Sequence, residues 1–106
     1  MRSKNTGERM AELILAKHVR DGVLTVGICD KEHVGKVYEE GNKQIDTTGD
    51  FFDGEKVSAD EIKEALPKAK SATIVGKESV AIASEVYENP QVLVVDDIPL
   101  ISIFKV

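Results

Sequence analysis

The chain has 106 residues, of which 42% are hydrophobic and 31% charged, and its formal net charge is −5. This composition fits one globular domain with a core of its own, and it excludes a basic nucleic-acid footprint spread over the whole surface. The acidity is concentrated in residues 30–64, which carry five Lys and eleven Asp/Glu.

The sequence indicates a reducing, non-membrane environment. Cys29 is the single cysteine, so no disulfide can form within the chain. No apolar run approaches the roughly 18 residues that a membrane span needs, and the N-terminus lacks the apolar segment of a secretory signal. We therefore expect a cytoplasmic protein without a membrane partner.

Residues 1–9 are polar and lack periodicity, and we predict a disordered N-terminal extension there. Residues 10–106 are predicted to form a single globular domain. It begins with Met10–Arg20 and Val23–Cys29, which are rich in Leu, Ile and Val. Asp21-Gly22 between them is typical of a type I′ turn and predicts a β-hairpin with positive φ at Gly22. Apolar residues on both faces of the first strand predict a central or covered strand.

The stretch from Cys29 to Gly54 is the longest connection in the chain, glycine-punctuated and acidic, and it is where we expect a functional surface. Asp30 is predicted to cap a helical turn over Lys31–Val34 that stops at Gly35. Two short strands are expected at Lys36–Tyr38 and Lys43–Thr47, with a turn between them at Gly41-Asn42. Of Phe51 and Phe52, one is expected to anchor this stretch to the core and the other to stay partly exposed.

The second half of the chain predicts two helices and three strands. Ser58 and Glu61 form a capping box, and an apolar stripe follows it at Ile62, Ala65, Leu66 and Ala69. Pro67 predicts that the helix ends or kinks near Ala65. Further elements are expected as a strand at Ala72–Val75, a helix at Lys77–Tyr87, and a strand pair, Gln91–Val95 and Leu100–Val106, around a turn at Asp96–Pro99. The predicted fold class is α+β, a mixed sheet with N- and C-terminal hairpins and two helices on one face.

Several short motifs carry a family resemblance: Gly35-Lys36 with Glu39-Glu40-Gly41, Gln44-Ile45-Asp46, Phe51-Phe52-x-Gly54, Ile74-Val75-Gly76 and Ile98-Pro99. Through these motifs the chain, from about Met10 to the C-terminus, resembles the archaeal family catalogued as domain of unknown function 424. The resemblance implies a small archaeal cytosolic protein associated with translation or RNA processing. It carries over no catalytic residue.

Candidate chemical sites each compete with a structural interpretation. Cys29 and His33 could offer two metal ligands, but a structural zinc takes four and there is no second cysteine. A catalytic Cys29 would need His33 or His18 as a base, whereas a buried cysteine at a strand end is the commoner arrangement.

The carboxylates of the central stretch do not form an EF-hand, because Phe51 stands where such a loop needs glycine. A looser Mg²⁺ site on Asp46 and Asp50 stays open beside a solvated acidic loop. Gly76-Lys77-Glu78-Ser79 opens a helix after a strand, as phosphate-binding loops do. Ser71 stands where a phosphate-binding loop has a further glycine, and Glu78 would repel the anion. No cofactor is predicted.

Three hypotheses follow. The first is a non-catalytic binding module for a protein or ribonucleoprotein partner, with an aromatic ring able to stack on single-stranded RNA. Its candidate residues are Lys36, Tyr38, Glu39, Gln44, Asp46, Phe51 and Phe52. Lysines gathered with Arg20 on one side, at Lys31, Lys36 and Lys43, would favour RNA, and an apolar patch would favour a protein.

The second hypothesis is a small metal-assisted enzyme with Glu39, Asp46 and Asp50 around one point. The third is a structural subunit of a homo-oligomer, paired through a strand edge or a helix face. The lack of a complete catalytic motif ranks the binding module first.

Overall fold

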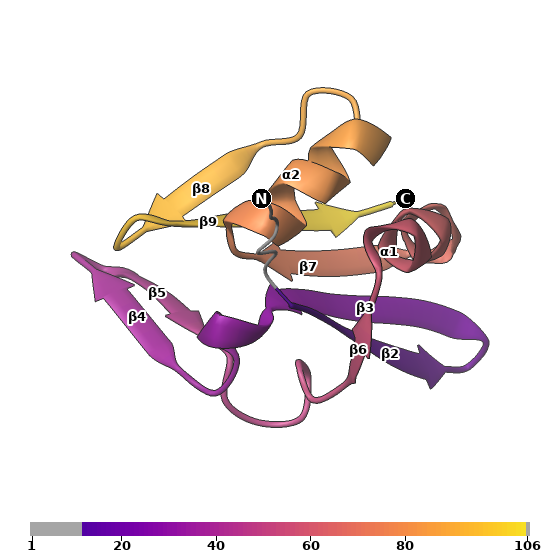
Figure 1. Cartoon of the computed structure of the whole chain (residues 1–106), viewed down its shortest axis with the longest axis horizontal. Helices are drawn as coiled ribbons and strands as arrows, with labels where there is room; N and C mark the ends of the chain where they lie inside the picture. Colours follow the sequence, from indigo (N-terminus) through magenta and orange to yellow (C-terminus); the bar gives the residue numbers. More distant parts are fainter. Residues whose placement is uncertain (1–11, 106) are drawn as a thin grey trace, which may run out of the picture.

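The computed structural model describes residues 12–105, so the predicted N-terminal extension lies outside the described residues. A six-stranded mixed sheet has the order β6-β2-β3-β7-β9-β8, and β4 and β5 form a separate two-stranded sheet (Figure 1). Two α-helices complete a single α+β domain, which confirms the predicted fold class. Neither helix of the described residues is long and apolar enough to span a membrane.

The elements follow the predicted order. They are β2 (Leu13–Arg20), β3 (Val23–Asp30), the 3₁₀ turn η1 (Lys31–His33), β4 (Val37–Glu40), β5 (Lys43–Asp46), β6 (Glu55–Val57), α1 (Ala59–Ala65), the 3₁₀ turn η2 (Leu66–Lys68), β7 (Ser71–Val75), α2 (Lys77–Val86), β8 (Val92–Val95) and β9 (Ile98–Phe104).

The β2–β3 hairpin is closed by the predicted turn, because Asp21 and Gly22 have φ of 54° and 77°. The strands pair from Arg20 opposite Val23 to Leu13 opposite Asp30. β2 is central over its first three residues, where β6 pairs with its other edge, which confirms the central position predicted for it. Beyond these residues that edge of β2 carries no strand within residues 12–105.

α1 begins and ends as its sequence predicts. The Ser58 hydroxyl accepts the Glu61 backbone N–H at 3.2 Å, and the Glu61 carboxylate accepts the Ser58 N–H at 3.2 Å. The α-helix ends at Ala65, and Pro67 lies within the 3₁₀ turn that follows. Pro67 lies in the first positions of this turn, where a backbone N–H would have no carbonyl partner within the turn, so the missing N–H of proline loses no hydrogen bond.

Both helices pack on one face of the sheet, as predicted, and we call this the helix face. Its core joins alternate residues of β2, β3, β7 and β9 to the apolar sides of α1 and α2. The fully buried side chains at its centre are Val26, Ile28, Ile62, Leu66, Ile74 and Ile101.

Of the residues that the structure describes, those on the opposite face are covered only at one end. There the β4–β5 hairpin and Phe52 pack on Cys29, Val75 and Val95 in a second, smaller cluster. Figure 1 shows this hairpin beside the β8–β9 turn, at the other end of the molecule from the β2–β3 turn. The other end of this face carries neither helix nor hairpin among the described residues.

Three local predictions need correction. Asp30 makes no side-chain cap to η1, because its carboxylate bonds to the start of α2 instead. The last turn contains only Asp96 and Asp97, both with positive φ, so Ile98 and Pro99 already belong to β9. Strand β6 was not predicted at all, since three residues with two charges carry no strand periodicity.

Candidate functional site

The residues predicted for binding lie mainly on or beside the β4–β5 hairpin. Tyr38 stands opposite Ile45, and both side chains belong to the second cluster. Burial raises the pKa of the Tyr38 phenol, which shares a hydrogen bond of 2.7 Å with His33 Nδ1. Glu39 and Gln44 alternate with this pair, and the Gln44 amide donates to the Glu39 carboxylate at 2.9 Å. Tyr38 therefore serves the packing of the hairpin, and the exposed Glu39 and Gln44 bond to each other.

The base of the hairpin is held by a buried threonine. Thr47, 1% exposed, donates its N–H to the Lys36 carbonyl at 2.9 Å, and its hydroxyl accepts the Lys36 N–H at 2.9 Å. Lys36 is thus fixed through its backbone. The lysines named with Arg20 do not gather, since Lys31 forms an ion pair with Glu12 at 3.0 Å and Arg20 lies at the far end of the sheet.

The acidic residues of the central stretch do not converge. Asp46 accepts the side-chain hydroxyl and the backbone N–H of Thr48, and these two bonds lower the pKa of the Asp46 carboxyl. Among the described residues, one group of three side chains brings possible metal ligands within 4.8 Å of one another: Asp30, Glu32 and His33. Glu39, Asp46 and Asp50 are not part of it, so the metal-assisted enzyme finds no site where it was predicted.

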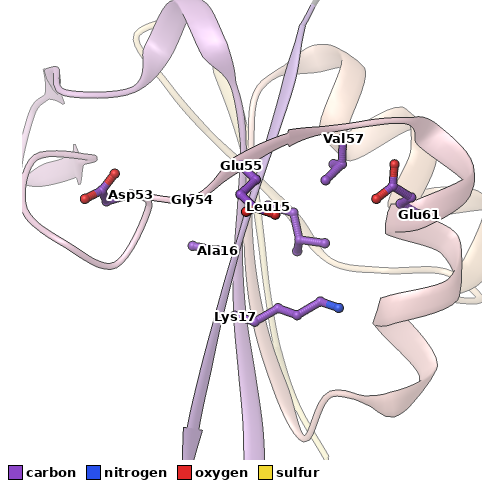
Figure 2. Close-up of a pocket in the computed structure, with 8 residues that line it drawn as sticks. All are labelled: Leu15, Ala16, Lys17, Asp53, Gly54, Glu55, Val57 and Glu61. Carbon is purple, nitrogen blue, oxygen red and sulfur yellow. The ribbon is translucent and has the colours of Figure 1, made fainter.

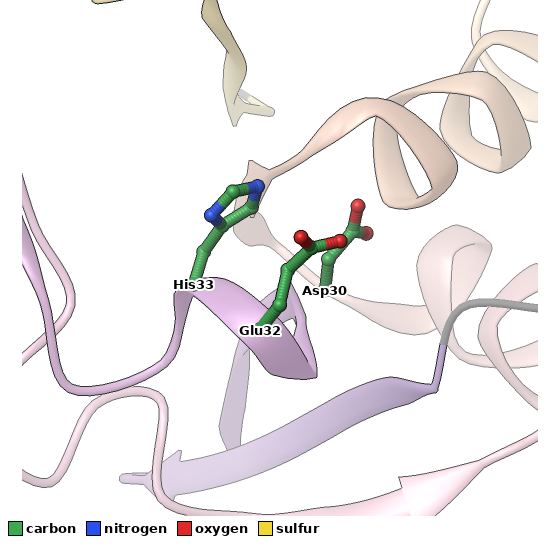
Figure 3. Close-up of side chains that lie close together, drawn as sticks. All are labelled: Asp30, Glu32 and His33. Carbon is green, nitrogen blue, oxygen red and sulfur yellow. The ribbon is translucent and has the colours of Figure 1, made fainter.

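The group of Asp30, Glu32 and His33 is organised around a helix start rather than around an ion (Figure 3). Asp30 is 2% exposed, and its carboxylate accepts the backbone N–H groups of Glu78 and Ser79 and the Ser79 hydroxyl at 2.7 to 3.2 Å. These are unpaired donors at the first turn of α2, so Asp30 caps a helix 48 residues away in sequence.

The Asp30 carboxylate also lies where a phosphate would bind at the start of α2, so the phosphate site considered from the sequence is occupied by a side chain. Gly76 has φ of 108°, and a Cβ there would collide with the Asp30 carboxylate. A carboxylate already satisfies the α2 N-terminus, where a phosphate would otherwise bind. Cys29 beside it is fully buried, and desolvation followed by the Asp30 charge raises the pKa of its thiol to about 12. A thiol held neutral in this way is not a nucleophile at neutral pH.

A hollow of about 320 Å³ lies where the chain crosses β2 from one face to the other (Figure 2). It contains acidic side chains, but Figure 2 shows Asp53 on the opposite side of β2 from Glu61. Glu61 is also bonded to the N-terminus of α1. Asp53 and Glu61 therefore do not form a pair for general acid and base catalysis.

As predicted, one of Phe51 and Phe52 is buried and the other is partly exposed. Phe52 is 5% exposed within the second cluster, and Phe51 is partly exposed on the sheet surface. The Phe51 ring stacks on His18, with centroids 5.1 Å apart, and His18 Nε2 shares a hydrogen bond of 2.9 Å with the Phe51 carbonyl oxygen. A Cβ at Gly27 would lie 2.6 to 2.9 Å from Phe51 atoms, so only glycine lets Phe51 lie against β3.

Beyond Phe51, no element within residues 12–105 covers the face opposite the helices, and we call this part the open face. One row of residues runs across β2, β3, β7 and β9: His18, Thr25, Ser71 and Phe104. The Ser71 hydroxyl donates to that of Thr25 at 3.0 Å. The next row adds Thr73 and Ser102, so the open face presents hydroxyls between an aromatic stack and a phenylalanine, Phe104, that is 70% exposed.

Cationic side chains border both ends of this row. A hollow of about 880 Å³ lies along the part of the β2 edge that carries no strand within residues 12–105, and it is lined by Arg20 and Asp21 beside His18 and Phe51. At the other end, the Lys70 ammonium lies 5.8 Å from the centroid of the Phe104 ring. Lys68 and Lys105 line a hollow together with Lys70 at the same end of the sheet, but Lys68 pairs with Glu64 and the Lys105 ammonium donates to the Leu66 and Pro67 carbonyls. One cation, Arg20 or Lys70, therefore lies near each end of the row.

Phe51 and Arg20 of the open face are predicted from the sequence as binding residues and His18 only as a possible base, whereas Thr25, Ser71, Thr73, Ser102 and Phe104 are not predicted. Signals for the open face were present as a glycine inside an apolar strand, Gly27, and as alternation in β7 and β9. Ser71 and Thr73 alternate with buried Ala72 and Ile74, a pattern typical of a strand with one exposed face. Only the register, which places Phe104 level with Ser71, joins these residues into one surface.

A comparison with known protein families shows to which family the chain belongs. The model of the family described as "Protein of unknown function (DUF424)" matches residues 18–106. The chain belongs to this family. The match covers all the motifs that carried the resemblance, and it includes the whole row of the open face.

A solved structure shares the fold of this DUF424 member. It is the crystal structure of an uncharacterized conserved protein from Methanopyrus kandleri, with a TM-score of 0.71 and 13% sequence identity. The similarity covers 88% of this chain and 90% of that chain, so nearly the whole fold is common to both. No curated protein matches the chain.

Proposed function

We propose that the chain is a non-catalytic, cytoplasmic module that binds single-stranded RNA on the open face, in association with translation or RNA processing. The observation that carries this proposal is the row of His18, Thr25, Ser71 and Phe104, with an aromatic platform at each end and hydroxyls between them. Bound bases would stack on the platforms, and the cations at both ends would contact phosphates.

The dimensions of the row suit a short single strand. Its ends are separated by three strand spacings of about 4.8 Å, which gives roughly 14 Å. RNA-binding sheets commonly stack two or three bases on aromatic residues across adjacent strands. Phe104 is suited to such a contact because an exposed ring has a free π-face, on which any base can stack.

The hydroxyl groups between the platforms supply polar recognition. Thr25, Ser71, Thr73 and Ser102 can each donate and accept a hydrogen bond. Base edges and the ribose 2′-hydroxyl offer matching groups, and the 2′-hydroxyl distinguishes RNA from DNA. Because each hydroxyl can both donate and accept a hydrogen bond, this surface can bind RNA strands of different base sequence.

The cations explain how an acidic protein could bind a polyanion. Arg20 borders one platform, and Lys70 lies over the other. The overall charge of −5 opposes long-range attraction of RNA, so only short-range phosphate contacts contribute. We expect modest affinity and a shallow salt dependence, equivalent to about two phosphate contacts.

The test is fluorescence anisotropy with a labelled ten-nucleotide single-stranded RNA of mixed sequence. Phe104→Ala should weaken binding by roughly 5-fold to 150-fold, the effect of losing one base–aromatic stack. Lys70→Gln should weaken binding less and reduce the salt slope by about one contact. The matched control is Val37→Ala, since Val37 is 48% exposed on the hairpin at the other end of the molecule.

Two results would overturn the proposal. The first is equal affinity of the native protein and Phe104→Ala for this RNA. The second is equal binding of a double-stranded RNA, whose bases cannot stack on the row. Binding of a neutral polysaccharide in place of RNA would also count against it, because the cations would then have no role.

A further inference from the structure

β8 is an exposed apolar edge strand. Val92, Leu93 and Val94 are 42%, 48% and 47% exposed, and neither charge nor proline occurs within Val92–Val95. β8 ends the strand order of the sheet, and within residues 12–105 no strand pairs with its outer edge. Soluble proteins ordinarily protect such an edge with charges, proline or a bulge, so an unprotected apolar edge requires an explanation.

The backbone of this edge also offers hydrogen bonds. Val94 is level with Pro99, which has no N–H, so these two residues cannot exchange a pair of ladder hydrogen bonds. The Pro99 carbonyl accepts the Gly76 N–H at 3.0 Å, on the side away from β8. The N–H and C=O groups of Val94 therefore point to the open edge, where an added strand would meet them.

Acidic side chains bracket this edge. Asp96 and Asp97 form the turn after β8, and the Glu40 carboxylate of the hairpin accepts the Asp96 N–H at 2.8 Å. Glu88 precedes β8 in the chain. A ligand complementary to an apolar strand between these acids is apolar in its middle and basic at its ends.

We propose that β8 is a docking edge for an extended segment of a partner protein, with apolar residues at alternate positions and basic residues at both ends. The segment would add a seventh strand to the sheet, as peptides do when they bind by strand addition. Backbone bonds at Val94 and the apolar side chains of β8 would hold it, and the surrounding acids would select its charged ends.

A second copy of the chain fits this edge less well. A stable interface needs about 800 Å² from each partner, and a four-residue strand with three partly exposed side chains supplies only a small part of that. Further contact area would have to come from the acidic surroundings of β8 on both copies. Two copies with a net charge of −5 each would repel one another there.

The test uses a labelled ten-residue peptide that alternates valine and threonine between two lysines at each end. Its affinity is measured by fluorescence anisotropy for the native protein, for Val94→Pro and for Val94→Thr. Val94→Pro removes the outward N–H and should weaken binding at least about tenfold. Val94→Thr keeps both the N–H and the shape, and should bind within about threefold of the native protein.

Val94→Lys serves as a second variant if the proline substitution disturbs folding, and lysine repulsion should again reduce binding at least about tenfold. Binding of the labelled RNA to these variants shows that the rest of the molecule is intact. Equal binding by Val94→Pro, equal binding of a peptide with glutamate ends, or failure of the lysine-ended peptide to bind at millimolar concentration would overturn the proposal. Dimerisation that is lost in Val94→Pro would also overturn it, in favour of a second copy.

Discussion

The sheet surface opposite the helices has two halves built from the same strands. Under the β4–β5 hairpin, β3, β7 and β9 present Cys29, Val75 and Leu100, which pack with Phe52 and Ile45. Two to four residues farther along, the same strands present Thr25, Ser71, Thr73 and Ser102. The change from apolar to hydroxyl side chains follows the boundary of the covering hairpin.

Burial explains the covered half and part of the position of Phe51, which packs against the second cluster, but it does not explain the exposed ring of Phe104. Phe104 is 70% exposed, and Phe51 lies at the border on a glycine that leaves room for its ring. Isolated exposed apolar residues are common. The proposed RNA binding depends on two rings at opposite ends of one hydroxyl row, with Arg20 near one ring and Lys70 near the other.

The largest expected difference between the halves concerns Phe52 and Phe104. Phe52→Ala should reduce the free energy of unfolding by about 3–5 kcal/mol, because it empties the centre of the second cluster. Phe104→Ala should change it by no more than about 0.5 kcal/mol, since the ring is exposed. Urea unfolding of both variants measures the contrast. Equal losses would mean that Phe104 is a packing residue.

Gly27 marks the border between the halves. Gly27→Ala should destabilise the fold by about 1–3 kcal/mol, because the added methyl collides with the Phe51 ring and carbonyl oxygen. The double variant Gly27→Ala/Phe51→Ala should lose less than the sum of the two single variants, since removal of the ring relieves part of the collision. Strict additivity in urea unfolding would show that Phe51 does not lie against β3.

The reactivity of the Cys29 thiol shows whether the β4–β5 hairpin stays packed on the covered half of the sheet. A thiol pKa of about 12 in place of 9.0 leaves about a thousandfold less thiolate at pH 8, so iodoacetamide should modify the folded protein far more slowly than the urea-unfolded chain. The folded state retains the proton that the unfolded chain releases near pH 9, so this group lowers stability as the pH rises from about 9 to about 12. Rapid modification at pH 8 would contradict a closed cluster.

Much of the fold could be predicted from local sequence signals. The Asp21-Gly22 turn, the Ser58 capping box and the stop at Pro67 each depend on residues a few positions apart, and the structure confirms them. Such local signals cannot predict hydrogen bonds between residues that are far apart in the sequence. Asp30 resembles a local cap, yet its carboxylate caps α2, because that helix starts with a glycine that has no side chain to cap it.

The candidate site could be predicted only in part, for the same reason. The central stretch was expected to carry the surface, and Phe51 does reach it. The other predicted residues lie on or beside the hairpin, where Tyr38 and Phe52 pack inward. Ser71 and Phe104 are 33 positions apart in the sequence, and only the pairing of β7 with β9 places them side by side.

The most direct test of the account is a titration of the ¹⁵N-labelled protein with a ten-nucleotide single-stranded RNA, followed by NMR. We expect the largest amide shift changes at Thr25, Ser71, Thr73, Ser102 and Phe104, with little change over residues 36–46 of the hairpin. Shift changes concentrated in the hairpin, or none at millimolar RNA, would contradict the assignment of the open face as the RNA-binding surface.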